Sequence, residues 1–197
     1  DLLQLWSVQL ELEALKGGGS AEADGTGVLA AVLPPALLAA AAQAAEGGGE
    51  ATSGFQEEVA AALRGVQAQL AGSADAAVRI ASVAAEELLP CCRRRVDALV
   101  SLSDGRRLAV EADGPWHFLA NAPEESDGPT ALRDRQLARG VDGVVVVPWR
   151  EWDMVRGADA RVAYLRERLG LAGAAMEGRT PPRRGQGRGG ALRALQG

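Results

Sequence analysis

The apolar residues that follow Ser53 recur at helical spacing. They lie three or four positions apart, which places them on one side of a helix. This stripe consists of Phe55, Val59, Ala62, Leu63 and Val66. Ser53 can cap the start of the helix, because Gln56 stands at the third helical position and can reach back to the cap. The pattern therefore predicts a core helix that begins after Ser53.

Two segments of alternating apolar and polar residues, Arg94 to Leu102 and Arg106 to Asp113, predict β-strands. The turn between them consists of residues 103–105 and ends in Gly105, which tolerates a positive φ. A three-residue turn gives the hairpin one continuous apolar face, whereas a slip of one residue would mix the faces. The aligned pairs are Val96 with Ala112, Ala98 with Val110, and Val100 with Leu108.

The opposite face of this hairpin is acidic. The same register places Asp97 across from Glu111 and Arg95 across from Asp113, so three acids converge on one surface. These acids are candidates for catalytic carboxylates, and Asp97 with Glu111 for metal ligands. The alternative is that Arg95 and a second arginine neutralise them, while Asp113 caps the turn that follows.

The segment before the hairpin, Ala74 to Leu89, leaves two structures open. Val78, Arg79 and Ile80 alternate like a short strand, but they stand among alanines that favour helix. After the hairpin, residues 119–129 predict a polar loop. Thr130 can then cap a short helix that runs through Arg139 and ends at Gly140.

The last predicted elements are a strand and a helix. Four consecutive valines, Val144 to Val147, are typical of a strand buried on both faces, and Pro148 ends it. Asp159 can cap the final helix, which Gly170 closes. Its inward-facing residues are Val162, Leu165 and Leu169.

The first fifteen residues are dense in leucine and predict a helix. It is either the last helix of a larger helical array, buried against a segment outside this chain, or a helix that folds back on the domain. Residues 17–27 predict a linker, and Val28 to Ala45 a helix interrupted at Pro34-Pro35.

We therefore expect an α/β domain at residues 51–172, with a small mixed sheet and flanking helices. Helical segments with Gly-rich linkers precede it at residues 1–50. Residues 173–197, which are rich in arginine and glycine, predict a disordered basic tail.

Composition narrows the function classes. The formal net charge of −5 excludes a nucleic-acid binder that works by overall charge, although it allows a local basic patch. The two cysteines, Cys91 and Cys92, are adjacent, which suits neither an ordinary disulfide nor a structural zinc site and indicates a reducing compartment. No apolar run is long enough to span a bilayer. The chain begins with Asp1 rather than methionine, so we expect a fragment or a processed form.

The rarest side chains follow the acidic strand directly. After the Gly114-Pro115 break come Trp116, the single histidine His117, and Phe118. Aromatic side chains can stack on unpaired bases, and arginines can bind backbone phosphates. The candidate RNA-binding residues are Trp116, His117, Phe118, Arg133, Arg135, Trp149 and Trp152. The alternative is core packing for the aromatic residues, which we favour for Trp152, and a solvated helix face for the arginines.

These motifs, in order and spacing, resemble the RAP domain over roughly residues 53–170. The series consists of Phe55-Gln56-x-x-Val59, Val96-Asp97, the block from Val110 to Phe118, Thr130-Ala131-Leu132-Arg133-x-x-x-Leu137, Val146-Val147-Pro148-Trp149-x-x-Trp152 and Tyr164-Leu165. The resemblance implies an RNA-binding module at the end of an organellar RNA-metabolism protein. Similar domains end the mitochondrial Fas-activated serine/threonine kinase-like proteins and the octotricopeptide-repeat proteins of algal chloroplasts.

What the resemblance implies for function is transcript processing, stability, splicing or translation in a chloroplast or mitochondrion. The implied partner is single-stranded organellar RNA, with ribosomal or granule proteins as an alternative partner class. No membrane and no small-molecule substrate are implied, and RNA binding itself requires no cofactor.

The resemblance also implies a fold like that of the PD-(D/E)xK restriction endonucleases. Asp97 and Glu111 match their metal-binding acids, and Glu57 or Glu58 could match the acid of the first helix, which makes a Mg²⁺-dependent endoribonuclease the alternative function. The lysine of that pattern is replaced by Asp113, and the helix position that could lend a lysine holds Arg133. Arginine is a poor proton acceptor, so we expect binding rather than cleavage.

Overall fold

The fold is built on a mixed four-stranded sheet, seen in a computed structural model that describes residues 1–15, 29, 32–47, 53–74 and 76–171. Its strands lie in the order β1 (Ile80–Leu89), β2 (Arg94–Leu102), β3 (Arg107–Asp113) and β6 (Gly143–Pro148). The first three strands are antiparallel, and β6 is parallel to β3. The α/β class with a mixed sheet and flanking helices is thus confirmed.

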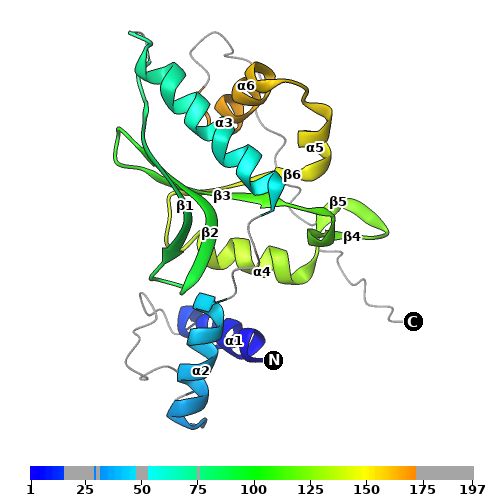
Figure 1. Cartoon of the computed structure of the whole chain (residues 1–197). Helices are drawn as coiled ribbons and strands as arrows, with labels where there is room; N and C mark the ends of the chain where they lie inside the picture. Colours follow the sequence, from blue (N-terminus) through cyan, green and yellow to red (C-terminus); the bar gives the residue numbers. More distant parts are fainter. Residues whose placement is uncertain (16–28, 30–31, 48–52, 75, 172–197) are drawn as a thin grey trace, which may run out of the picture.

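One face of the sheet is covered by α3 (Gly54–Ala71), α5 (Trp149–Met154) and α6 (Ala158–Arg168), as Figure 1 shows. Their apolar residues form a core with the even-numbered residues of β3 and with the β2 residues Ala98, Val100 and Leu102. The predicted stripe on α3 lies in this core, and Leu63, Val66 and Leu165 are buried within it.

The other face is covered by α4 (Gly128–Leu137) together with α1 (Leu2–Leu15) and α2 (Pro35–Gly47). Trp6 and Leu10 of α1 pack against alanines of α2 and belong to the same core as Val96 and Leu99 of β2. The Trp6 indole Nε1 also donates a 2.9 Å hydrogen bond to the buried carbonyl of Cys92. The first helix therefore folds back on the domain, and its predicted place at the end of a larger helical array stays a prediction.

Several local predictions are confirmed. Ser53 and Gln56 form the reciprocal capping box of α3. The hairpin turn is the predicted one, with Gly105 at a φ of 90°, and the observed register pairs Ala98 with Val110 and Val100 with Leu108. Both cysteines are free thiols, as the adjacent spacing indicated.

The structure decides one open alternative and corrects other predictions. Within Ala74 to Leu89, where strand and helix were both left open, residues 80–89 are a strand, because pairing with β2 outweighs the alanine preference for helix. Residues 119–129 are not a simple loop, since β4 (Phe118–Leu119) and β5 (Ala122–Ser126) form a second, two-stranded sheet there. The strand β6 lies at a sheet edge with only Val147 fully buried.

Both helix caps of the second half also differ from the prediction. Asp127 caps α4 by accepting the Thr130 backbone N–H at 2.8 Å, so the helix begins three residues earlier. Gly157 precedes α6, and Asp159 stands in its first turn.

The linker predicted at residues 17–27 and the tail at residues 173–197 lie outside the described residues. None of the helices in the described part of the chain combines the length and apolar character that a membrane span needs. The helix predicted over Val28 to Ala45 is described from residue 32 onward, where α2 begins at Pro35 after a turn.

Helices α3 and α6 approach each other closely at Gly65. A Cβ atom at this position would lie 2.7 Å from Cγ2 of Val162, whose β-branched side chain has few alternative rotamers. We expect Gly65→Ala to lower the free energy of unfolding by about 1 kcal/mol, because overpacking outweighs the helix propensity gained from alanine. Chemical denaturation measures this change.

Val162→Ala supplies the control for this prediction. In that background Gly65→Ala should stabilise the protein, since the clash is gone and the propensity gain remains. Equal effects of Gly65→Ala in both backgrounds would contradict a contact between Gly65 and Val162.

Candidate functional site

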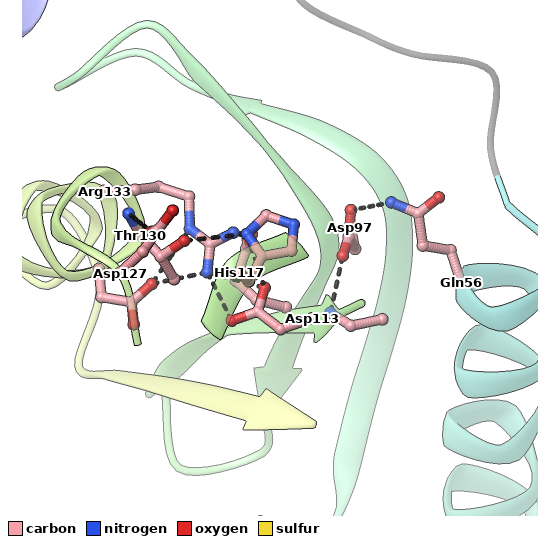
Figure 2. A network of polar contacts seen from close by, with 10 residues as sticks. Gln56, Asp97, Asp113, His117, Asp127, Thr130 and Arg133 are labelled. Carbon is pink, nitrogen blue, oxygen red and sulfur yellow. Dashed lines mark hydrogen bonds and ion pairs between the residues drawn. The ribbon is translucent and has the colours of Figure 1, made fainter. Parts of the chain in front are cut away.

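Arg133 joins α4 to the acidic end of β3. Its Nη1 lies 3.2 Å from Oε2 of Glu111, and its Nη2 donates to both carboxylate oxygens of Asp113 at 3.0 Å. Asp134 accepts a further bond from Nη2 at 2.8 Å. The Asp113 side chain is 1% exposed and that of Glu111 5%, so the arrangement is a buried ion-pair cluster (Figure 2 shows its Asp113 and Arg133). We call Arg133, Glu111 and Asp113 the arginine clasp.

The arginine clasp contains more acid than base. Burial raises the pKa of Glu111 from 4.5 to about 8, with Arg133 opposing this shift and Asp97 and Asp113 adding to it. Burial also raises the pKa of Asp113, against the effects of Arg133 and His117. For Arg133, burial lowers the pKa, but the surrounding acids outweigh burial and hold its pKa above the usual range. With a pKa of about 8, Glu111 is largely protonated at neutral pH, while Arg133 holds Asp113 through two hydrogen bonds.

Asp97 is not paired with Glu111 in the sheet, which corrects the predicted register at this pair, although its charge adds to burial in raising the pKa of Glu111. The β2–β3 pairing ends at Ala98 and Val110. Beyond it, Asp97 Oδ2 accepts the Ala112 backbone N–H at 2.7 Å, and Oδ1 accepts the amide of Gln56 at 2.6 Å. Figure 2 shows Asp97 turned toward Gln56 of α3.

The cause is a break in the alternation of β2. Val96 and Leu99 pack in the core on the α4 side of the sheet, while Ala98 packs in the core on the α3 side. Strict alternation would place Val96 and Ala98 together. The neighbouring strand is irregular at the same level, where Glu86 has a φ of 53°. An irregularity of this kind re-aims a side chain, here that of Asp97.

Arg95 does not contact Asp113, contrary to the predicted register. It donates hydrogen bonds to the carbonyl oxygens of Glu46 and Glu86. The arginine that neutralises the acids is Arg133, from α4. The prediction that a second arginine neutralises the acids is therefore confirmed, whereas the same role predicted for Arg95 is wrong.

The carboxylates, as they are engaged here, do not fit a magnesium site. Both oxygens of Asp97 accept hydrogen bonds from protein groups, and Arg133 binds Glu111 and Asp113. Glu58 accepts from Trp152 and pairs with Arg161, each at 2.9 Å. Within the described residues, no group of three acidic, histidine or cysteine side chains is arranged to hold a metal ion.

The turn after β3 presents Trp116 to solvent. Residues Pro115–His117 form a short 3₁₀ helix, and the Asp127 backbone N–H donates to the His117 carbonyl at 3.0 Å. The His117 ring Nδ1 lies 3.0 Å from Thr130 Oγ1 and 3.8 Å from Asp113 Oδ1. Trp116 itself is 91% exposed, which makes it the most exposed aromatic side chain in the described part of the chain. The turn is thus anchored on both sides while its tryptophan points outward.

Phe118 and Trp149 flank this turn and are partly buried. The guanidinium of Arg150 lies 5.4 Å from the centre of the Phe118 ring, and its Nη1 contacts Glu124 at 2.7 Å. The guanidinium of Arg150 and the ring of Phe118 form a cation–π contact, and an unpaired base can stack on such a pair.

Trp152 and Arg135 occupy other environments. Trp152 is 1% exposed and packs between the rings of Phe55 and Tyr164, which fits the packing role that we favoured. Arg135 lies on the α1 side of α4, where its Nη2 contacts Glu11 at 2.9 Å. The structure therefore brings Trp116, His117 and Phe118 together and places Trp152 away from solvent.

The sequence analysis did not identify the hydrogen-bond partners of several site residues. Gln56 had a signal only as a helix cap, yet its side-chain amide also holds Asp97. Asp127 stands three residues before Thr130, the spacing of an N-cap acceptor, and this signal was available. Glu11 contacts residues more than a hundred positions away, for which local patterning has no signal.

Comparison with known families shows that residues 110–168 match the RAP domain. The match begins within β3 and ends with α6, so it contains the arginine clasp and the Trp116 turn. The resemblance drawn from the motifs is thereby confirmed, and RAP domains are generally RNA-binding modules. No curated protein sequence matches this chain.

The arginine clasp predicts a large stability effect at Arg133. Arg133→Met should lower the free energy of unfolding by about 3–5 kcal/mol, because it leaves buried Asp113 without its partner. Arg135→Met, on the same helix but at a solvent-exposed pair, should cost less than about 1 kcal/mol. Adding Asp113→Asn to Arg133→Met should recover part of the loss. Equal costs at the two arginines, measured by chemical denaturation, would contradict the clasp.

Glu111 predicts a pH dependence of stability. Between pH 4.5 and about 8 the folded protein keeps a proton on Glu111 that the unfolded chain has lost. The folded state therefore binds more protons, and the free energy of unfolding should fall as the pH rises through this window. Glu111→Gln should flatten this decline, because the amide does not titrate. Denaturation curves at a series of pH values test it, and parallel profiles for both proteins would refute the assignment.

Proposed function

We propose that this chain binds single-stranded RNA through the face that carries Trp116, with the RAP domain at residues 110–168 as the binding module. The proposal is supported by the general role of RAP domains and by the side chains of this face. Base stacking on aromatic rings is the main sequence-tolerant contact of proteins with unpaired nucleotides.

The exposure of Trp116 carries the proposal. A tryptophan buries about 150–250 Å² when it packs, and hydrophobic burial contributes about 25 cal/mol per Å², so solvent exposure forfeits several kcal/mol. This chain keeps the indole 91% exposed, although the turn beneath it is tied to β3 and α4. A rigid turn loses little conformational freedom when a ligand binds, which favours affinity. The arrangement suits a stacking platform.

The charge distribution indicates that stacking contributes more than bulk electrostatics. Arg150, which lies over the Phe118 ring, is already paired with Glu124, and the more exposed Arg135, on the α1 side of α4, is paired with Glu11. The whole chain has a formal net charge of −5. We therefore expect a modest salt dependence of RNA affinity compared with a basic RNA-binding domain.

The acids of β3 act in this proposal as structure rather than as catalysts. Arg133 binds Asp113 and Glu111, and the Glu111 pKa of about 8 keeps that carboxyl largely protonated at neutral pH. Mg²⁺ prefers free anionic oxygen donors, whereas both of these carboxylates are already engaged by Arg133. A fold related to the PD-(D/E)xK nucleases remains our proposal, with their chemistry absent.

We further propose an organellar role, in which the module positions a longer protein on chloroplast or mitochondrial transcripts for processing, stability, splicing or translation. This part rests on the resemblance to organellar RAP proteins. An alternative role on ribosomal or granule proteins would be indicated if the purified chain showed no RNA affinity.

Trp116→Ala should weaken binding of a fluorescently labelled single-stranded RNA by about 5- to 150-fold, the loss of roughly 1–3 kcal/mol from one stacked base. Met154→Ala is the matched control, because Met154 is 75% exposed on α5 and its truncation also removes exposed apolar surface. Fluorescence anisotropy measures both affinities. Equal affinity of Trp116→Ala and the unmodified protein would refute the role of Trp116.

The same binding reactions, run with Mg²⁺ and with a chelator, separate binding from cleavage. The RNA should stay intact in both conditions, as judged on a denaturing gel. Product that requires Mg²⁺ and disappears in Glu111→Gln would establish an endoribonuclease instead.

A further inference from the structure

Glu11 of α1 is surrounded by donors from the end of α4. Its Oε2 accepts from Arg135 Nη2 at 2.9 Å, and its Oε1 accepts from Arg139 Nη2 at 2.9 Å. Arg139 Nη2 also lies 3.1 Å from Oε2, and the Gln136 side-chain amide lies 3.2 Å from Oε1. One carboxylate thus receives hydrogen bonds from three side chains.

This donor set suits a phosphate as well as a carboxylate. Guanidinium groups bind both anions through paired N–H donors, and a side-chain amide adds a neutral donor. Buried Gln136 is fixed by its neighbours, since its Oε1 accepts from Arg94 and its amide also reaches the Ser7 carbonyl. The two arginines are accessible, with side chains 61% and 36% exposed.

Glu11 is not what holds α1 in place. Trp6 anchors the helix through its buried hydrogen bond to Cys92 and its packing in the core. Ser7 adds a 2.7 Å hydrogen bond from Arg94. Exposed ion pairs contribute little stability, so the Glu11 carboxylate can be displaced by a competing anion while α1 stays docked.

We propose that Arg135, Gln136 and Arg139 form a phosphate-binding site for the RNA backbone, and that Glu11 occupies this site as an intramolecular competitor. This inference rests on the proposed RNA-binding function and adds a second contact region to it. RNA binding then requires exchange of the Glu11 carboxylate for a phosphodiester, which lowers the apparent affinity.

The positions of the two regions fit one strand of RNA. His117 of the Trp116 turn contacts Thr130 in the first turn of α4, and the arginine site lies at the other end of this helix. Figure 1 shows α4 between the β4–β5 sheet and α1. The seven residue steps from Thr130 to Leu137, the last residue of α4, rise roughly 10 Å at 1.5 Å per residue, and Arg135 and Arg139 each lie two residues from that end. A short single strand that stacks on Trp116 can therefore reach the arginines.

The test measures the affinity of the full chain for a labelled oligouridylate by fluorescence anisotropy. Glu11→Gln should bind about fivefold more tightly than the unmodified chain, because the amide no longer competes for the arginines. Glu13→Gln is the matched control: it makes the same charge change two residues away on α1, where the carboxylate accepts from Gln9. It should change the affinity less than about twofold.

A second pair of variants assigns the gain to the site. Arg139→Gln should weaken RNA binding in both backgrounds, because it removes a hydrogen-bond donor to the phosphate, and the loss should be larger in the Glu11→Gln background, where it should abolish the gain. The salt dependence should follow the same pattern, with a steeper slope for Glu11→Gln, since one or two more phosphates are neutralised. Circular dichroism confirms that each variant is folded.

The outcomes separate this inference from the proposed function. If Trp116→Ala weakens binding while Glu11→Gln binds no better than Glu13→Gln, the role of Glu11 as a competitor is refuted, and the proposed RNA-binding function stands. If no variant binds RNA, both proposals fall. If Glu11→Gln gains as much affinity for polyglutamate as for RNA, the site takes acidic peptides, and its assignment to the RNA backbone is overturned.

Discussion

The ion pair between Arg133 and Asp113 fixes the geometry on which the rest of this domain depends. Asp113 is the last residue of β3, and Arg133 lies in the middle of α4, so their contact ties the helix to the end of the strand. Burying a charged pair costs desolvation free energy and adds little net stability. Its value here is positional: no apolar pair would fix α4 relative to β3 through two directed hydrogen bonds to one carboxylate.

The exposed turn follows from that contact. The chain leaves β3 at Asp113, turns at Gly114 and Pro115, and is tied back to α4 where His117 meets Thr130. Asp127 connects the turn to α4 through two contacts: its carboxylate caps α4, and its backbone N–H donates to the His117 carbonyl. Trp116 lies between these contacts, and its side chain is 91% exposed.

The sequence predicts the parts of this fold that depend on near neighbours. The Ser53–Gln56 cap and the turn at Gly105 involve residues at most three positions apart, and the hairpin register follows from the turn. The segment that contains residues 80–89 was left open between strand and helix, because only pairing with β2 decides it. Asp97 turns away from its predicted position because β2 is irregular beside it. For Glu11 and Arg133, the partners are fixed only when the helices are packed, so the residue types indicated charge pairing without naming the pairs.

An acidic protein that binds RNA, as we propose for this domain, has to keep its acids from repelling the phosphate backbone. In this domain the acids are neutralised locally. Glu111 is held largely protonated by burial, and Asp113 is paired with Arg133. Glu124 and Glu11 are paired with arginines at the surface. The surface pairs differ from the buried ones in one respect: water and salt weaken them, so a phosphate can replace the carboxylate. The buried acids are therefore fixed structure, whereas the exposed pairs are the part of the charge distribution that RNA can rearrange.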